Sequence, residues 1–406
     1  MGCLPRTATV SALLAVLVLG GCLGEEERRS RITGNTATVY ASLPRTGVSA
    51  PAARAVAAGQ RLALEDAGGR AGGLRVKLVE QGAADRDGAA WSPDRVSANA
   101  ERAADDPRAI AYLGELDYGA SAVSVPITND AGLLQVSPTD TLTSLTQTPI
   151  GRPRAGPERY YPTGSRSFAR LVPNDDLLAE TLLELARQGG ARRMAVLFDA
   201  DIYSRELAGQ LVALGRRDGP SPVHFEEYLG EVEEIPDVAR RLAEGRPDLV
   251  VYAGIAGPGT GRMLAQIEAR LPGVPVYATA GLLARDPAAP IPAAPATVRA
   301  LGAMPPRREL TAEGRRLLER VAREAGPEAA RAEALYGYEA MRLVLDAIRA
   351  GGPNRERVRR AGTRIRTRES ALGDYLLRGT GDVDTQRFSV WALRDGRFVF
   401  VRMMEP

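Results

Sequence analysis

The chain has 406 residues, with 53 basic and 50 acidic side chains, two cysteines and one histidine. The net charge of +3 argues against a dedicated nucleic-acid binder, which carries a clear basic excess. Cys3 and Cys22 both lie near the N-terminus, so the remaining chain offers no disulfide, Cys-based zinc site or Cys nucleophile. A single histidine, His224, excludes a His-rich metal site. We therefore expect no metal and no cofactor, and the length predicts two or three domains or one bilobed body.

Residues 1–21 have the pattern of an export signal. A positive start is followed by an apolar stretch over residues 8–19 and by two small residues. That stretch is about a dozen residues long, shorter than the roughly 20 that a membrane-spanning helix needs. Leu19–Cys22 resembles the bacterial lipobox, which implies that Cys22 is acylated and anchors the mature chain to the membrane. Residues 22–35 then form a charged tether, and we expect the rest to be extracytoplasmic.

The first half of the body alternates strand-like segments with segments that carry apolar residues at helical spacing. In chain order, this pattern predicts strands over 36–43, 74–80, 109–114 and 133–136, alternating with helices over 52–67, 94–105 and 120–131. Such an order is typical of a parallel sheet with helices on both faces.

A Pro-, Gly- and Arg-rich stretch over 143–168 separates this series from a second one. The second series predicts helices over 175–188, 203–216 and 261–271 and strands over 193–198, 248–253 and 274–278. The segment around His224 also has a strand-like composition. Two helices near 311–324 and 329–350 follow, and a hairpin over 388–393 and 397–403 turns at Asp395-Gly396.

The sequence therefore predicts an α/β fold of two doubly wound parallel-sheet lobes joined by several crossovers. We expect lobe 1 to comprise 36–172 and 299–372, and lobe 2 to comprise 173–298 and 373–406. Ligands bind beyond the carboxyl ends of the strands in such sheets, so the expected site is the cleft between the lobes.

Polar residues follow two neighbouring strands of the first lobe. Asp117 comes after the strand 109–114 and is placed to cap the next helix, where the amides of Tyr118 and Gly119 would face an anion. After the strand 133–136, the hydroxyls of Ser137, Thr139 and Thr141 suit a carboxylate. Capping alone explains either segment equally well, but their position at adjacent strand ends favours a binding site.

The sequence gives less support to a catalytic site, a dinucleotide site or a lipid-binding patch. It contains neither a nucleophile elbow nor a phosphate loop. The glycine-rich segment 257–261 has the wrong spacing for a dinucleotide site and is interpreted as a strand-to-helix turn. Tyr160-Tyr161 is expected to pack within its loop rather than on a ligand. The Arg-rich segment 355–368 is expected to be a solvated helix, with Val358 and Ile365 inward, rather than a lipid-binding patch. We do not expect an enzyme.

Gly114–Pro126, Gly132–Thr141 and Ser144–Thr146 resemble the type I periplasmic-binding-protein family, in particular the Leu/Ile/Val-binding proteins of branched-chain amino acid ABC transporters. Further matching motifs begin at Leu43 and Arg170, and the resemblance spans about residues 36–400. It implies a solute-binding lipoprotein that delivers an amino acid or related amide to an ABC permease by hinge closure. We expect a monomer whose partners are this ligand, the permease and the membrane.

The resemblance assigns the ligand α-carboxylate to residues that match Tyr118, Gly119, Thr139 and Thr141. On the second lobe it implies contacts from Tyr203, Gly254 and Ile255. The family's acidic partner for the ammonium falls near Ala280, which carries no charge. Its possible substitutes are Asp117, Asp140 and Asp175, unless the ligand is not an α-amino acid. A ligand sensor or envelope scaffold of the same fold and an extracellular enzyme are the alternatives, and a neighbouring permease gene would favour transport.

Overall fold

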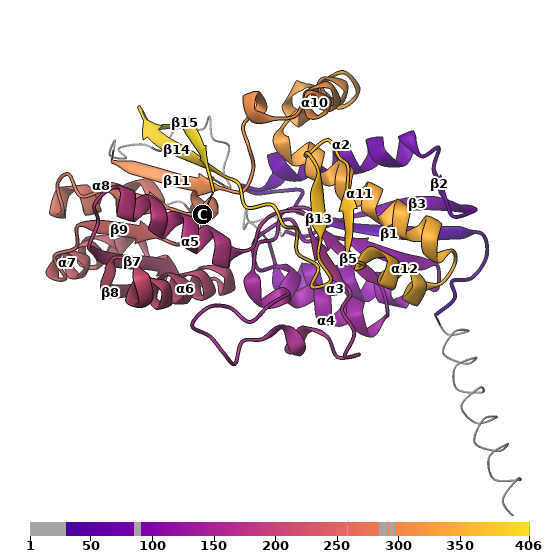
Figure 1. Ribbon diagram of the computed structural model, residues 1–406, viewed down its shortest axis with the longest axis horizontal. Helices are drawn as coiled ribbons and strands as arrows, with labels where there is room; N and C mark the ends of the chain where they lie inside the picture. The colour runs from indigo at the N-terminus through magenta and orange to yellow at the C-terminus, as the bar shows by residue number, and fades with distance from the viewer. Residues whose placement is uncertain (1–29, 85–90, 258, 284–290, 292–296, 406) are drawn as a thin grey trace, which may run out of the picture.

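The structure is a computed structural model that describes residues 30–84, 91–257, 259–283, 291 and 297–405. The chain forms two α/β lobes side by side, and within the described residues it passes between them three times (Figure 1). The expected export signal, Cys22 and most of the tether lie outside the described residues. Among the helices that the structure describes, none is long and apolar enough to cross a membrane.

The first lobe is built on a six-stranded sheet in the order β2-β3-β1-β4-β5-β6. Its strands are β1 (Thr36–Leu43), β2 (Arg70–Ala71), β3 (Leu74–Gly82), β4 (Ala109–Leu113), β5 (Leu134–Ser137) and β6 (Phe168–Arg170). Neighbouring strands pair in parallel, except that β2 and β3 are antiparallel. The four strands predicted in this half are confirmed, and β2 and β6 are two short edge strands that the pattern did not predict.

Helices cover both faces of this sheet (Figure 1). On one face lie α2 (Ala50–Asp66), α11 (Ala332–Gly351) and α12 (Arg355–Gly362), with α10 (Ala312–Ala325) outside them; on the other lie α3 (Pro93–Asp105) and α4 (Ser121–Asp130). Successive residues of a strand point to opposite faces, so Val39 packs in the cluster with α11 whereas Tyr40 packs in the cluster with α3. A parallel strand buried on both faces is largely apolar, as β4 is throughout and β1 is apart from its threonines and Ser42.

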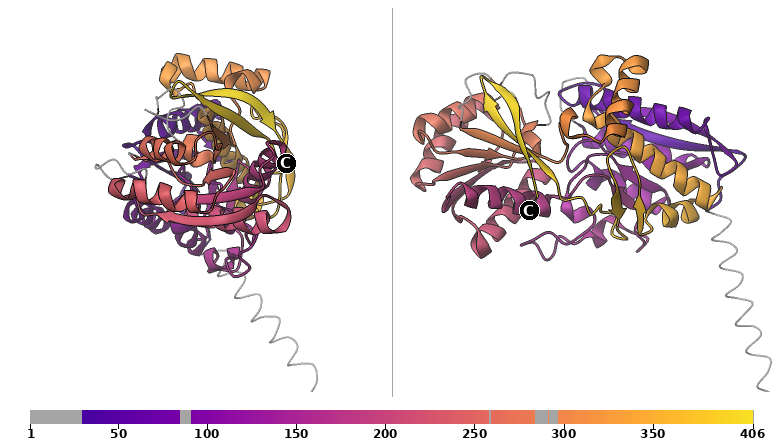
Figure 2. Two further views of the ribbon diagram at one scale, coloured as in Figure 1. Left: turned by 90° about the vertical axis from the view of Figure 1, so that its left-hand side faces the viewer. Right: turned by 45° about the horizontal axis from the view of Figure 1, so that its top comes forward.

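The second lobe has a seven-stranded sheet in the order β15-β14-β11-β10-β9-β7-β8. Its strands are β7 (Arg193–Asp199), β8 (Ser221–Tyr228), β9 (Leu249–Tyr252), β10 (Val276–Ala278), β11 (Val298–Gly302), β14 (Phe388–Arg394) and β15 (Arg397–Met404). The hairpin β14–β15 is confirmed, and Figure 2 shows it at the side of the second lobe that lies next to the crossovers. Its turn residues Asp395 and Gly396 have φ of 50° and 73°.

The helices of the second lobe form two layers as well. One layer contains α5 (Asp175–Gln188) and α6 (Ile202–Asp218), and the other contains α7 (Ile235–Glu244) and α8 (Thr260–Arg270); α9 (Ala280–Leu283) is a single turn. Along β7, Val196 joins the core beneath α5 and α6 while Leu197 joins the core beneath α7 and α8. The sequence reading missed α7, although its buried Ile235, Val238 and Leu242 have helical spacing.

Strand pairing moves two of the three expected lobe boundaries. Residues 299–302 belong to β11, which pairs with β10 and β14, so they lie in the second lobe and not in the first. Beyond residue 372, β13 (Tyr375–Leu377) pairs with β12 (Arg366–Arg368), and both Tyr375 and Leu377 join the core of the first lobe. The shorter 3-10 helices are η1 (Thr143–Leu145), η2 (Pro157–Tyr160), η3 (Val232–Glu234), η4 (Arg307–Glu309) and η5 (Pro327–Ala329).

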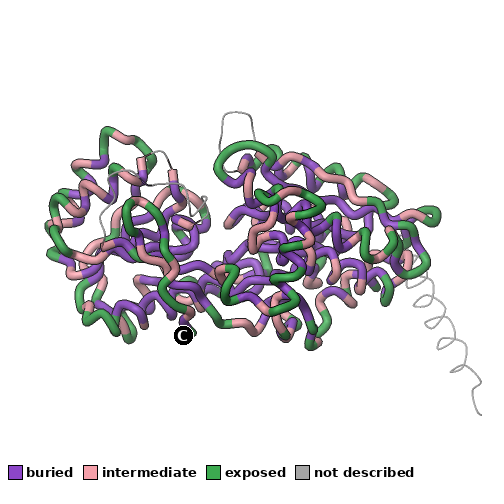
Figure 3. The backbone as a smooth tube through the Cα atoms, turned by 90° about the horizontal axis from the view of Figure 1, so that it is seen from above, coloured by how far each residue is buried: buried purple, intermediate pink, exposed green. Residues whose placement is uncertain are grey.

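A buried ion pair ties the crossovers together. Arg170 at the end of β6 has 0% exposure, and its Nε lies 3.0 Å from Oδ1 of Asp382 in the third crossover. The same guanidinium donates to the carbonyls of Asp140 and Leu142 in the loop after β5. Residues 170–175 of the first crossover are all buried, and Figure 3 shows buried backbone at the junction between the lobes. Arg170 therefore connects the loop after β5 to the first and third crossovers.

The tyrosine pair 160–161 packs as predicted, whereas the Arg-rich segment 355–368 does so only in part. Tyr160 and Tyr161 are buried in one cluster with Leu145, and the Tyr161 hydroxyl donates to the Leu145 carbonyl at 2.6 Å, so packing within the loop is confirmed. In the Arg-rich segment, Val358 is buried as expected, but Ile365 is 65% exposed because it lies beyond the end of α12.

Candidate ligand-binding site

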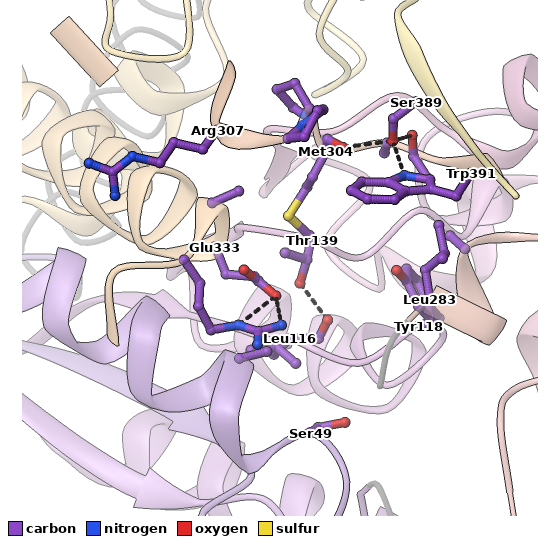
Figure 4. A pocket seen from close by; sticks show the side chains of 18 of the residues that line it. Ser49, Leu116, Tyr118, Thr139, Leu283, Met304, Arg307, Glu333, Ser389 and Trp391 are labelled. Atoms are coloured by element: carbon purple, nitrogen blue, oxygen red, sulfur yellow. Dashed lines mark hydrogen bonds and ion pairs between the residues drawn. The ribbon is translucent and has the colours of Figure 1, made fainter. Parts of the chain in front are cut away.

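A cavity of about 390 Å³ lies between the two lobes (Figure 4). The first lobe lines it with residues after β1, β4 and β5 and with the start of α11, including Ser49, Leu116, Asp117, Tyr118, Thr139 and Glu333. Residues from the second lobe and the crossover after β11 include Leu283, Met304, Arg307, Ser389 and Trp391. This volume falls in the range of about 300–1,000 Å³ that small-molecule sites occupy.

The second-lobe side of the cavity is largely apolar and has its polar atoms satisfied. The Trp391 indole Nε1 donates a hydrogen bond to Ser389 Oγ at 2.8 Å, and the Ser389 hydroxyl in turn donates to the Met304 carbonyl at 2.8 Å. Figure 4 shows the Met304 side chain directed across the cavity toward Thr139. These hydrogen bonds fix the indole by its polar edge and Phe400 packs against the ring at 5.6 Å, so the part of the ring that lines the cavity is held in place for apolar contact with a ligand.

Asp117 is a buried acid on the first-lobe wall. The sequence predicted that the Asp117 side chain caps α4, and this prediction is wrong. The carboxylate instead accepts a 2.5 Å hydrogen bond from the Ser49 hydroxyl at the start of α2. Within the described residues this is the one hydrogen bond to its carboxylate. Burial raises the pKa of Asp117 to about 7; the Ser49 bond opposes this rise, whereas Asp140 and Asp201 add to it. The carboxyl group therefore changes charge near neutral pH.

Asp140 organises the loop after β4 from the inside. Its fully buried carboxylate accepts hydrogen bonds from the amides of Gly119 at 3.1 Å, Ser121 at 3.0 Å and Leu142 at 3.1 Å. The Gly119 amide, which the sequence led us to expect at a ligand anion, is therefore already bonded to a carboxylate of this chain. The acceptor expected at the start of α4 is therefore the side chain of Asp140 rather than a ligand.

Two of the three hydroxyls that were expected to bind a carboxylate have internal roles instead. Ser137 Oγ donates to the Glu115 carbonyl at 2.7 Å and accepts from the amides of Thr139 and Asp140. The Thr139 hydroxyl donates to the Leu116 carbonyl. Thr141 is 2% exposed and does not line the cavity, where Thr139 represents this loop.

Two further buried acids flank the site without lining the cavity. Asp175 at the start of α5 is 1% exposed, and burial raises its pKa well above the usual value, although the nearby Thr141 hydroxyl and Arg170 oppose the rise. Glu115 accepts a 2.7 Å hydrogen bond from Tyr112, and burial raises its pKa to about 8. Burial therefore favours the neutral form of both carboxyl groups.

The two lobes contact each other through aromatic rings. Tyr118 stacks on Tyr203 with ring centroids 4.9 Å apart and an interplanar angle of 27°. Tyr203 is completely buried, and its hydroxyl donates to Thr279 Oγ1 at 3.1 Å. The adjacent Gly119 has φ of 80°, and a Cβ there would lie 2.6 Å from Cγ2 of Ile202. Glycine is therefore required where the first lobe meets α6.

Gly254 and Ile255 serve the second lobe rather than the cavity wall. The Ile255 amide donates to Asp199 Oδ2 at 2.7 Å, and its carbonyl accepts from the Tyr252 hydroxyl at 3.0 Å. Of the expected ligand residues, Asp117, Tyr118 and Thr139 line the cavity, whereas the others do not: Gly119, Ser137, Asp140, Thr141, Asp175, Tyr203, Gly254 and Ile255.

Several cavity residues were missed by the sequence reading. Met304 and Arg307 follow β11, a strand that was not predicted, and Trp391 lies in a hairpin that was predicted without a role. Trp391 is one of two tryptophans in the chain, which is a signal that could have drawn attention to it. Ser49 and Glu333 lie at helix starts and carry no local signal.

Both arginines at the cavity have acidic partners. Arg331 lies 2.9 Å from Glu333, and Arg307, which is about half exposed, lies 3.4 Å from Glu319. Within the described ranges, no group of three or more His, Cys, Asp or Glu side chains is arranged to hold a metal ion.

A family model described as periplasmic binding protein matches residues 38–391 of the chain. The chain belongs to the periplasmic binding protein family. Among solved structures, this periplasmic binding protein is similar to the leucine binding protein LivK of Thermotoga maritima, with 21% identity and a TM-score of 0.72 over 91% of this chain and 99% of that one.

Two other structures extend the likeness. LivJ of Streptococcus pneumoniae, solved with isoleucine, has 14% identity and a TM-score of 0.71 over 91% of this chain and 100% of that one. A Rhodopseudomonas palustris solute binding protein, solved with 4-hydroxybenzoate, has 15% identity and a TM-score of 0.72 over 91% of this chain and 97% of that one. The expected type I fold of two α/β lobes is confirmed. No curated protein matches the chain by sequence.

Proposed function

We propose that this periplasmic binding protein is the solute-binding component of an ABC importer and closes over a small ligand between its lobes. The observation that carries the proposal is the 390 Å³ cavity, because residues of both lobes line it. A ligand that touches both lobes stabilises their closed arrangement, whereas a ligand confined to one lobe does not. Hinge closure of this kind is one of the recurring modes of conformational change.

The contacts between the lobes support this mechanism. Besides the Tyr118–Tyr203 stack, the Ser144 amide of the first lobe donates to Glu206 Oε1 of α6 at 2.9 Å. An aromatic pair contributes about 0.5–1.5 kcal/mol beyond its buried area, too little to hold two lobes together against solvent without help. The ligand is proposed to supply the remaining free energy of closure.

Location and partners complete the proposal. Export and acylation at Cys22 would hold the binding lobes outside the cytoplasmic membrane on the tether 22–35. From there a monomer would present its ligand to the permease. The cavity lining includes no His, Lys or Cys among the described residues, which favours binding without turnover.

Binding can be tested on the full chain by thermal shift and calorimetry. The ligand panel contains leucine, isoleucine, valine, their amides, benzoates and apolar amines, and small-angle scattering measures closure. We expect at least one class to raise the melting temperature and to reduce the radius of gyration. No response to any class would contradict the proposed function, and product formation from a bound ligand would favour an enzyme.

A further inference from the structure

We propose that the cavity selects an apolar organic cation, such as a primary or quaternary amine, and rejects carboxylic acids. This inference rests on the proposed function and specifies the ligand class for the same cavity. It assigns Asp117 as the counter-ion and the apolar wall around Met304 and Trp391 as the contact for the ligand body.

The side chains that act electrostatically on Tyr118 in the cavity are acidic. The groups that act electrostatically on the Tyr118 ring hydroxyl are Asp175, Asp117, Glu333 and Asp140, and all of them are acidic. Asp140 of the first lobe and Asp201 of the second lobe also disfavour the charged form of Asp117. Asp117 and Glu333 also line the cavity, so a ligand carboxylate beside Tyr118 would lie next to two acidic groups, whereas a cation would be attracted to them when they are ionised.

Two of the groups that were expected to receive an anion, and both arginines at the cavity, already have partners within the protein. The Gly119 amide is bonded to Asp140, and the Thr139 hydroxyl is bonded to the Leu116 carbonyl. Arg331 is paired with Glu333, and Arg307 lies at the solvent-exposed rim beside Glu319. A ligand carboxylate would have to displace the present partner of any of these four groups before it could bind there.

Asp117 is the acid that is placed to act as the counter-ion. Of the three acids that could replace the missing charge at Ala280, Asp140 is consumed by backbone amides and Asp175 does not line the cavity. Asp117 lines it, and its second carboxylate oxygen receives no hydrogen bond from any described residue. A cation at this oxygen would complete the coordination that Ser49 begins.

The remaining wall suits the rest of such a ligand. The ring of Tyr118 lies next to Asp117 in the chain and also lines the cavity, and aromatic faces attract organic cations. Met304 and Trp391 offer a polarizable thioether and an indole to an apolar body. An acid, an aromatic ring and an apolar pocket together match an amine that carries a hydrocarbon group.

The test compares matched ligands on the full chain by calorimetry at pH 8. The pairs are 2-phenylethylamine with 3-phenylpropionate and 3-methylbutylamine with 4-methylpentanoate, and 2-phenylethanol is the neutral analogue; leucine is included because it carries both charges. We expect the amines to bind at least tenfold more tightly than the matched acids, the alcohol and leucine. Asp117→Asn should weaken amine binding by at least tenfold, and the control Asp237→Asn, which removes an exposed acid on α7, should change it less than twofold.

Tighter binding of the acids or leucine, or equal binding of amine and alcohol, would overturn the cation inference while leaving the proposed function intact. A response to no ligand at all would overturn both. If Asp117→Asn does not fold, the wild-type chain provides the test: affinity for a trimethylammonium ligand, which cannot titrate, should fall about tenfold from pH 8 to pH 6 as Asp117 is protonated, and a constant affinity would overturn the inference.

Discussion

Tyr118 of the first lobe stacks on Tyr203 of the second lobe at a centroid distance of 4.9 Å. The pair lies at the edge of the cavity, because Tyr118 lines it and Tyr203 is buried behind Tyr118. The same stack therefore closes one end of the binding site and joins the two lobes. Changes to either ring should affect ligand affinity as well as stability.

Replacing the buried ring separates these two effects. Tyr203→Ala removes the stack and leaves a cavity, so we expect a loss of about 3–5 kcal/mol in the free energy of unfolding and a two- to tenfold loss of ligand affinity. Tyr203→Phe keeps the stack and loses only the hydrogen bond to Thr279, which should cost about 1 kcal/mol and leave affinity unchanged. Urea denaturation and calorimetry measure both quantities. Equal affinities for the two variants would show that the stack does not assist closure.

The buried acids predict that the ligand-free chain loses stability as pH rises. Burial raises the pKa of Asp117 to about 7 and that of Asp201 to about 6, so between about pH 4 and pH 7 the folded chain binds more protons than the unfolded chain. Their contribution to stability is complete below pH 4 and is lost as pH rises through 6 to 7.

Melting temperatures from pH 4.5 to pH 8 check this dependence. Asp117→Asn should flatten part of the decline, and Asp237→Asn should leave the wild-type profile unchanged. Bound amine should also reduce the decline, because a cation stabilises the ionised form of Asp117. A wild-type melting temperature that rises from pH 5 to pH 8 would contradict the assignment of these acids.

Asp140 is expected to be essential for the loop after β4. Asp140→Ala removes the acceptor of three backbone hydrogen bonds, and we expect a loss of about 3 kcal/mol or more because buried amides are left without partners. Asp140→Asn retains one carbonyl oxygen and should lose less. Urea denaturation of both variants provides the comparison, and a stable Asp140→Ala chain that gains affinity for carboxylates would mean that the amides are a ligand site after all.

The buried pair of Arg170 and Asp382 should be more sensitive to the loss of one partner than of both. Asp382→Asn leaves the fully buried guanidinium without its counter-charge and is expected to cost about 3–5 kcal/mol. Arg170→Met combined with Asp382→Leu removes both charges and should recover part of this loss. Denaturation midpoints of the wild type and the two variants test this order, and a double variant less stable than Asp382→Asn would argue against direct coupling.

Much of the fold follows from periodicity in the sequence. Apolar β-rich segments such as 36–43 and 193–198 became central strands, because strands buried on both faces carry a continuous signal. Short strands were missed where pairing rather than composition defines them. β11 is the clearest case: it has five residues after a Pro-rich stretch, and its partners β10 and β14 are separated from each other by more than 100 residues in the chain. The displaced lobe boundary at 299 follows directly from that omission.

The site was predictable in position but not in detail. Strand ends and the resemblance located the loops that hold Asp117, Tyr118 and Thr139, which line the cavity. Local sequence cannot show that Asp140, 21 residues after Gly119, occupies the amide that a ligand was expected to occupy. Nor can it bring Met304 and Trp391 opposite Thr139, because that arrangement depends on the packing of two lobes.

The central claim, a ligand held between the lobes, is tested most directly by the fluorescence of Trp391. Trp91→Phe leaves Trp391 as the single tryptophan of the full chain, and Trp391 lines the cavity. We predict that 2-phenylethylamine changes its emission saturably, with the dissociation constant that calorimetry gives, and that Asp117→Asn shifts both measurements together. Calorimetric binding without any change in Trp391 emission would place the ligand elsewhere and contradict the account.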